Sequence, residues 1–408
     1  MDRNTKKIYM RGAVFVVPVL FIAGCRILPR ACFALAERDA RLAGPAYTTP
    51  VSMEDLEAER VRRDREAANA AAMARARDTK PVGAVPAVDG FKTASITSGQ
   101  QMPDAVAMDT DNVAWLSTHA GEVVVAPRNG GAPRVVAKEQ KLSQRRHNQA
   151  LALTSSHVYW VTAPKEEGEG TVMRAPIAGG APETLAEHLE GLTAIIAEKD
   201  NVWFARSPRI TRDDEGDGGV LGGVWLYKKE GSVRVVAAET PCALAVDDKN
   251  VYVVDASQVW RSPKLPGKKE VAATKLTTAT QRLGCSVAVD KEHVYWTIPG
   301  DDTVMRAKKA DGKEPRALGF IRSRPTNVAV DGGYAWVLTE TRPKALGEQG
   351  SVFRIALRAD LGSGAAVPQA VIVDQVGMNS IAAQGGHAIF TSYDQSENDG
   401  KITRVSAD

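Results

Sequence analysis

Three stretches of the sequence decide the fold: CALAVDDKNVYVV from Cys242, CSVAVDKEHVYWT from Cys285 and TNVAVDGGYAWVL from Thr326. Each predicts a short apolar strand that ends in Asp, a turn of about two to four residues, and a strand rich in aromatic residues. Weaker copies are DAVAMDTDNVAWL from Asp104, QALALTSSHVYWV from Gln149, TAIIAEKDNVWFA from Thr193 and NSIAAQGGHAIFT from Asn379. The pattern therefore occurs seven times.

One position in the aromatic strand marks the register of the repeats. Its occupants are Trp115, Trp160, Phe204, Val253, Trp296, Trp336 and Phe390, at spacings of 45, 44, 49, 43, 40 and 54 residues. Periods of about 40 to 50 residues with four strands each are typical of β-propeller blades, whereas helical solenoids would show a 3.6-residue periodicity. The spacing predicts an all-β, seven-bladed propeller.

A third strand also recurs, as in QVWRSP from Gln258 and TVMRAK from Thr303, and it carries an arginine at the same register in five repeats. These are Arg174, Arg261, Arg306, Arg354 and Arg404. A residue that repeats in five blades is expected to pair or stack at the blade edges. A unique site should instead break the repeat.

The seventh repeat ends after its third strand, whereas GFKTASIT, residues 90–97, reads as a lone strand before the first repeat. An open propeller would expose strand edges, and pairing this strand with the last blade removes them. We therefore expect residues 90–408 to form a propeller of four-stranded blades closed by its N-terminal strand.

These repeats resemble the YWTD and NHL-like propellers through HVYWV at His157, HVYWT at His293 and the order of strand, Asp, turn and aromatic strand. The resemblance covers about residues 90–408. It implies a propeller of the kind found in secreted and surface proteins, where the fold forms binding platforms, scaffolds and a few enzymes.

The composition is that of a folded protein with a balanced charge. Of 408 residues, 44% are hydrophobic and 25% are charged, and 52 Lys and Arg against 49 Asp and Glu give a formal charge of +3. This balance argues against a nucleic-acid partner. The four cysteines form no CxxC or zinc pattern.

The N-terminus has the form of a bacterial lipoprotein signal. A basic segment ending at Arg11 precedes the uncharged residues 12–23, which are too few to span a bilayer as a helix. Ile22-Ala23-Gly24-Cys25 resembles the lipobox. This predicts a signal peptide over residues 1–25, lipidation of Cys25 and a lipid-anchored protein of the bacterial cell envelope. Cleavage after Ala36 and an uncleaved signal anchor are the alternatives.

Residues 26–89 are expected to be a stalk, helical or disordered, between the lipid and the propeller. Ser52 and Asp55 form a capping-box pattern ahead of a run of good helix formers, which predicts a helix over about residues 53–78. Its apolar residues form no continuous stripe, which favours a solvated spacer over a coiled coil.

The first position of each inner strand predicts a polar ring at the mouth of the central channel, occupied by Asp104, Gln149, Thr193, Cys242, Cys285, Thr326 and Asn379. The two cysteines stand at this position in successive blades and should be neighbours. An oxidising compartment permits a disulfide between them. Two free thiols are the alternative.

The loops after the second and fourth strands of a blade share one face, and the long ones, residues 163–170, 207–223, 340–350 and 392–400, are all there. Residues that could bind a ligand at the channel mouth are Arg145, Arg146, His147, Arg282, Arg322 and Arg324. Asp213, Glu215 and Asp217 match a calcium loop in part, but Val224 stands where its bidentate Glu belongs, so a flexible acidic loop is the alternative.

These features favour a monomeric, non-enzymatic binding or scaffold lipoprotein that holds an envelope protein, peptide or glycan on its loop face. No cofactor is expected, apart from calcium at the acidic loop. The alternative is an enzyme at the channel mouth, of the propeller lyase or hydrolase type, for which His147 is the best-placed histidine.

Overall fold

The computed structural model describes residues 7–10, 13–16, 60, 87–142, 149–162, 169–207, 222–255, 258–265, 273–278, 283–321, 323–340, 349–357, 365–395 and 397–407. The chain divides into two units, residues 1–75 and 76–408. In the first, β1 (Lys7–Met10) and β2 (Ala13–Val16) pair as an antiparallel hairpin. Across the described residues, no helix is long and apolar enough to cross a membrane. The predicted helix over residues 53–78 lies outside the described residues except for Arg60, which is helical.

The second unit contains seven four-stranded antiparallel sheets, numbered here as blades 1 to 7. Blade 1 contains β4 (Pro103–Met108), β5 (Asn112–Ser117), β6 (Glu122–Pro127) and β7 (Arg134–Ala137). Blade 2 contains β8 (Leu151–Leu153), β9 (His157–Val161), β10 (Gly170–Pro176) and β11 (Glu183–Leu189). Blade 3 contains β12 (Leu192–Glu198), β13 (Asn201–Arg206), β14 (Gly223–Leu226) and β15 (Val233–Ala237).

Blade 4 contains β16 (Pro241–Val246), β17 (Asn250–Asp255), β18 (Gln258–Pro263) and β19 (Thr274–Thr278). Blade 5 contains β20 (Val287–Val289), β21 (His293–Ile298), β22 (Thr303–Lys308) and β23 (Arg316–Phe320), with a short 3-10 helix at Pro299–Asp301. Blade 6 contains β24 (Arg324–Asp331), β25 (Tyr334–Glu340), β26 (Gln349–Ala356) and β27 (Gln369–Val376). Blade 7 contains β28 (Ile381–Gln384), β29 (His387–Asp394), β30 (Asp399–Ala407) and β3 (Phe91–Gln100).

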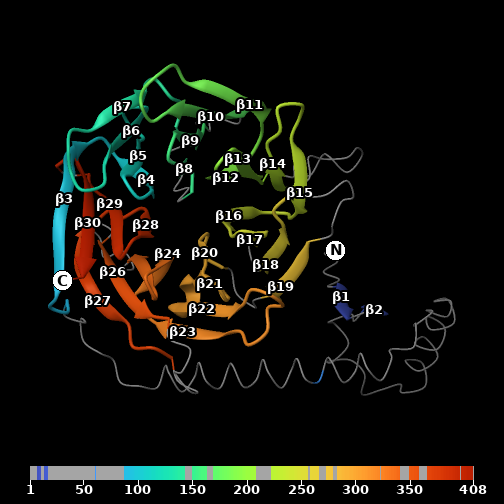
Figure 1. Cartoon of the computed structure of the whole chain (residues 1–408). Coiled ribbons are helices and arrows are strands. Elements are labelled where there is room, and N and C mark those ends of the chain that lie inside the picture. The colour runs from blue at the N-terminus through green and yellow to red at the C-terminus, as the bar shows by residue number, and fades with distance from the viewer. Residues whose placement is uncertain are drawn as a thin grey trace, which may run out of the picture. The chain divides into compact units, whose positions relative to one another are not determined.

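The seven sheets form a ring in which the first strands of successive blades contact one another, including those of blades 7 and 1 (Figure 1). The predicted seven-bladed propeller is therefore confirmed. Its central strands are buried on both faces because each sheet is packed between two others, so a strand such as β5 is apolar almost throughout.

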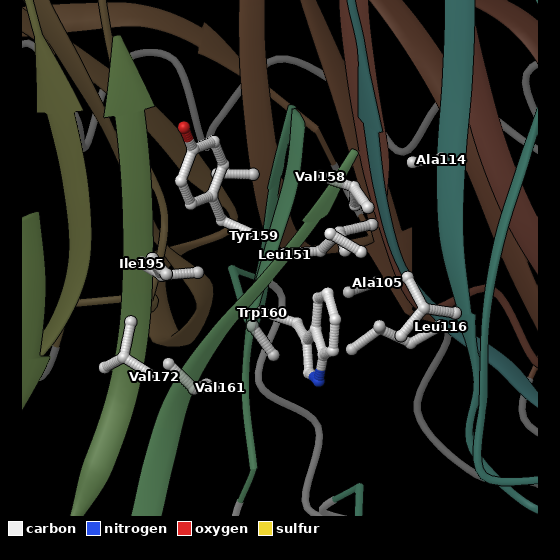
Figure 2. Close-up of a cluster of buried hydrophobic side chains, with 14 of the residues drawn as sticks. Ala105, Ala114, Leu116, Leu151, Val158, Tyr159, Trp160, Val161, Val172 and Ile195 are labelled. Atoms are coloured by element: carbon white, nitrogen blue, oxygen red, sulfur yellow. The ribbon is translucent and has the colours of Figure 1, made fainter. Parts of the chain in front are cut away.

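Large aromatic side chains fill the spaces between the blades. Trp115, Trp160, Trp203, Trp296 and Trp336 are fully buried. Figure 2 shows Trp160 of blade 2 among Leu151 of its own blade and Ala105 and Leu116 of blade 1, within one apolar cluster. The apolar clusters that contain Trp115, Trp160, Trp203 and Trp336 include residues of a neighbouring blade, so these four side chains pack between blades.

In blade 6 the register predicted from Trp336 is wrong by one residue. Strand pairing aligns Val337 with Trp296 and Phe390, because Val328 pairs with Val337 as Val287 pairs with Trp296. Trp336 therefore lies on the opposite face of its strand, where its ring meets Phe91 edge-on at 6.3 Å between centroids. Since side chains alternate along a strand, a one-residue error reverses the face.

The N-terminal strand closes the ring as predicted. β3 pairs antiparallel with β30, from Phe91 opposite Ala407 to Gln100 opposite Gly400. The Phe91 ring lies under the Arg354 guanidinium of blade 6, 4.6 Å from ring centroid to Cζ, and so joins blades 6 and 7.

The connections of the blades define two faces. Those after the first and third strands lie on what we call the short-turn face, and those after the second and fourth strands lie on the loop face. Because Phe91 begins β3 opposite the end of β30, residues before 91 enter the ring from the short-turn face. There the Val88 N–H donates to the Ala370 carbonyl at 2.8 Å.

One of the predicted long loops is instead a hairpin. Ser392, Tyr393 and Asp394 pair with Lys401, Gly400 and Asp399, so β29 and β30 extend through most of residues 392–400. Gly99 N–H also donates to the Asp399 carboxylate at 2.8 Å, which ties this hairpin to β3. Paired backbone replaces the free loop that the polar sequence indicated.

Candidate functional site

The predicted channel-mouth ring lies where the inner strands are irregular. Thr193, Cys242 and Thr326 each fall at a register shift between their inner strand and the next strand of the blade. Asp104 falls within a similar shift, while Gln149, Cys285 and Asn379 precede their strands. A bulged residue is released from the ladder and can turn toward a neighbouring strand.

Several ring residues use this freedom to bond the next blade. The Thr193 hydroxyl donates to the Pro241 carbonyl at 2.7 Å, which links blades 3 and 4. The Asn379 amide donates to the Pro103 carbonyl at 3.3 Å and links blades 7 and 1. The predicted polar ring thus serves as a brace between inner strands.

Gln149 reaches beyond the adjacent blade. Its side-chain amide donates to the Leu244 carbonyl at 2.9 Å, and its side-chain oxygen accepts from the Leu244 N–H at 2.5 Å. Its backbone carbonyl also accepts from Ile195 N–H at 2.8 Å. One residue of blade 2 therefore bonds to blades 3 and 4 and brings their inner strands together at this end of the channel.

Cys242 and Cys285 form a disulfide between blades 4 and 5, with 5.2 Å between their Cα atoms. Two serines at the following ring position, which the sequence reasoning missed, make similar links. Ser286 exchanges hydrogen bonds with the backbone of Val328 in blade 6, and Ser380 accepts from the Val106 N–H of blade 1 at 3.2 Å. Both serines directly follow a ring residue in the sequence, and this position could have identified them as contacts between blades.

Of the candidate ligand-binding residues, the structure places only Arg324. It begins β24 and lies 3.9 Å from Glu340, with half of its side chain exposed. Arg145, Arg146, His147, Arg282 and Arg322 lie outside the described residues, as do the calcium candidates Asp213, Glu215 and Asp217. Among the described residues, no three His, Cys, Asp or Glu side chains are grouped so as to hold a metal ion.

The repeated arginines join blades, as predicted. Arg306 donates to the Leu357 carbonyl of blade 6 at 3.0 Å, and Arg261 donates to the Lys309 carbonyl of blade 5 at 3.1 Å. Arg354 stacks on Phe91 and Tyr334. Arg174 differs, because it pairs with Glu183 of its own blade.

The short-turn face repeats a second device. In blades 1, 4 and 5, the Asp that ends the inner strand accepts two backbone N–H bonds from its own turn, as Asp247 does from Lys249 and Asn250. Such Asx turns explain why the sequence repeats strand, Asp and turn. His157, His293 and His387 begin the second strands of blades 2, 5 and 7, and His293 directly follows the Asx turn of Asp290.

A lysine from the next blade neutralises this acid at two of the interfaces. Lys309 lies 2.7 Å from the Asp247 carboxylate, and Lys264 pairs with Glu198, whose position in blade 3 is equivalent. Burial raises the pKa of Asp247, but hydrogen bonds from Lys309, the turn amides and Tyr252 outweigh it and hold that pKa below its usual value. Charge at these interfaces is balanced within the protein.

No protein-family model matches the sequence, and no curated protein matches it significantly. Solved structures do share its fold. A chain of a mitotic checkpoint complex is 12% identical over 80% of this chain and 96% of that one, with a TM-score of 0.54. An inactive virginiamycin B lyase from Staphylococcus aureus, solved with quinupristin, is 15% identical over 78% of this chain and 100% of that one, with a TM-score of 0.50. A streptogramin B lyase is 11% identical over 78% of this chain and 98% of that one, also with a TM-score of 0.50.

At these identities the likeness shows the fold alone. The class of protein is a β-propeller, here with seven blades, in which side chains beside the inner strands bond to neighbouring blades.

Proposed function

We propose that the protein is a non-enzymatic binding or scaffold module of the bacterial envelope, which holds a protein, peptide or glycan on its loop face. The observation that carries this proposal is the opposition of the two faces. The chain at residues 87–90 enters the ring on the short-turn face, while β9, β13 and β25 end on the loop face. A stalk from the membrane would thus present the loop face to a partner.

The hydrogen bonds of the ring side chains favour a partner that contacts the rim of the loop face. Thr193, Asn379 and Gln149 already bond to neighbouring strands, so these side chains serve the rigidity of the ring. The strands β9, β13 and β25, which end on the loop face, belong to blades 2, 3 and 6 and are therefore spread around that rim. A stable protein interface needs about 800 Å² on each partner, which a rim supplies more readily than a narrow channel.

Photo-crosslinking from defined positions tests the choice of face. A photoreactive residue at Glu190 or Glu239, exposed after the fourth strands of blades 2 and 3, is expected to crosslink an envelope partner. Lys199 and Lys249 are exposed turn residues of blades 3 and 4 on the opposite face and are the matched controls. Crosslinks from the two lysine positions alone would contradict the proposal.

The envelope location rests on the lipobox-like sequence at Cys25, which lies outside the described residues. Substituting Cys25→Ala is expected to move most of the protein from the membrane to the soluble fraction, because the thiol that receives the lipid is lost. Cys32→Ala is the matched control and should leave the protein on the membrane. Fractionation and palmitate labelling measure both variants, and a Cys25→Ala protein that stays labelled and membrane-bound would overturn this part of the proposal.

A further inference from the structure

The interface between blades 7 and 1 differs from the two interfaces where a lysine pairs with the acid of the preceding blade. By strand register, Arg128 occupies in blade 1 the position of Lys264 and Lys309, directly after the third strand. Those lysines face Glu198 and Asp247 of the preceding blade. Arg128 instead faces Gln384, which ends the inner strand of blade 7. An amide thus replaces the carboxylate at this interface.

Two further basic side chains gather at the same place. Arg404 of β30 donates to the Arg128 carbonyl at 3.3 Å and to the Asn129 side chain at 2.8 Å. His387 begins β29, two residues before the partner of Arg404 in the sheet. Within the described part of the chain, no carboxylate forms an ion pair with Arg128 or Arg404.

Two acidic residues beside this cluster accept hydrogen bonds from backbone N–H groups. Asp331 accepts the Gly386 N–H at 2.6 Å, and one oxygen of Asp109 accepts two N–H groups of its own turn. The other oxygen of Asp109 is buried and has no hydrogen-bond partner among the described residues. Within the same part of the chain, the Arg128 guanidinium donates to the carbonyls of Asp109 and Gln384, each at 3.4 Å, and its buried Nε finds no partner.

The pKa of His387 is lowered in part by the same excess of positive charge. Burial lowers its pKa first, and the charges of Arg128 and Arg404 lower it further, against a smaller opposing effect of Asp331. The Nδ1 atom of His387 is buried and has no partner. A negative ligand near these groups would reverse the effect of the two arginines and raise that pKa.

We propose that this cluster of Arg128, Arg404 and His387 binds a phosphate group. Two fixed guanidiniums match the charge of a phosphate, which is about −1.5 to −2 at neutral pH, and guanidinium forms strong charge-assisted hydrogen bonds to phosphate oxygens. The cluster lies on the face opposite the loop face, so this site is independent of the proposed binding function.

Calorimetric titration of the full-length protein with inorganic phosphate tests the proposal. Saturable binding is expected in the natural protein and should weaken at least about tenfold in Arg404→Gln, since a hydrogen bond to a charged group is lost. Arg174→Gln is the matched control, because Arg174 holds the same strand position but pairs with Glu183. Binding should be unchanged there.

The variant Gln384→Glu distinguishes a loss of phosphate binding from a loss of folding. It restores the acid that Glu198 supplies in blade 3, so Arg128 gains an internal partner, phosphate binding is lost and the melting temperature does not fall. In the natural protein, NMR should show the pKa of His387 rising when phosphate is added, with His387→Asn identifying the signal. No saturable binding, or equal binding in Gln384→Glu, would overturn the proposal.

The source of the phosphate group is distinguished by vesicles of phosphatidylglycerol mixed with the Cys25→Ala protein. Sedimentation with vesicles that is lost in Gln384→Glu and Arg404→Gln assigns the site to a lipid headgroup. Sedimentation that does not follow these variants, while binding of inorganic phosphate does, assigns it to a soluble phosphate compound.

Discussion

Deleting residues 1–97 is expected to open blade 7, lower the melting temperature by about 10 °C or more and cause aggregation. The deletion removes most of β3, so Phe91 no longer packs against Trp336 and Arg354, and β30 becomes an exposed edge. The loss of a buried Phe alone costs about 3 to 5 kcal/mol, and a free strand edge promotes pairing with other chains.

Deleting residues 1–84 is the control, because it leaves β3 and the Val88 contact with Ala370 intact. Its melting temperature should match that of the full chain in thermal denaturation. If both truncations melt at the same temperature without aggregation, β3 does not close the ring.

Replacing both Cys242 and Cys285 by Ala is expected to cost about 4 kcal/mol of stability. Their disulfide closes a loop with a sequence separation of 43, and a crosslink of this length lowers the entropy of the unfolded chain by about that amount. For a propeller of this size, the melting temperature should fall by about 8 °C.

Reductant is the internal control. It should lower the melting temperature of the natural protein to that of the double variant and leave the double variant unchanged. Mass spectrometry after alkylation without reductant measures the bond directly. Modified thiols at both Cys242 and Cys285 would contradict the crosslink.

The sequence predicted those parts of the fold that its repeats encode. Seven copies of an inner strand, a turn and an aromatic strand predicted the number of blades. Asp follows the inner strand in four of these copies, and in blades 1, 4 and 5 it bonds its own turn amides. The lone strand at residues 90–97 predicted the closure. The repeated arginine predicted contacts between blades, and Arg261, Arg306 and Arg354 make such contacts.

Other features depend on geometry that a repeat does not contain. The bulges at Thr193, Cys242 and Thr326 decide where ring side chains point, and a pattern of alternating residues does not reveal them. The reach of Gln149 to Leu244 joins residues of blades that are not adjacent. In blade 6 the aromatic residue used as the register mark lies on the other face, since Val337 occupies the equivalent position.

The candidate phosphate site lies where the repeat is interrupted, because Gln384 stands in the position of an acidic residue. Arg128 and Gln384 look ordinary in the sequence, because neither belongs to a binding motif. The seventh copy of the repeat already places Gln384 where Asp247 stands in the fourth, and the strand register adds that Arg128 occupies the position of Lys309. Of the candidate arginines near the channel mouth, Arg324 alone lies in the described residues.

The pairing of β3 with β30 is central to this account, because it closes the ring, sets the face on which the chain enters and completes blade 7. Hydrogen exchange of the full-length protein measures this pairing directly. The amides of residues 91–97 are expected to exchange as slowly as those of the buried strand β29, since both should open only with the whole propeller. Exchange of residues 91–97 within seconds, while β29 stays protected, would contradict the closed ring.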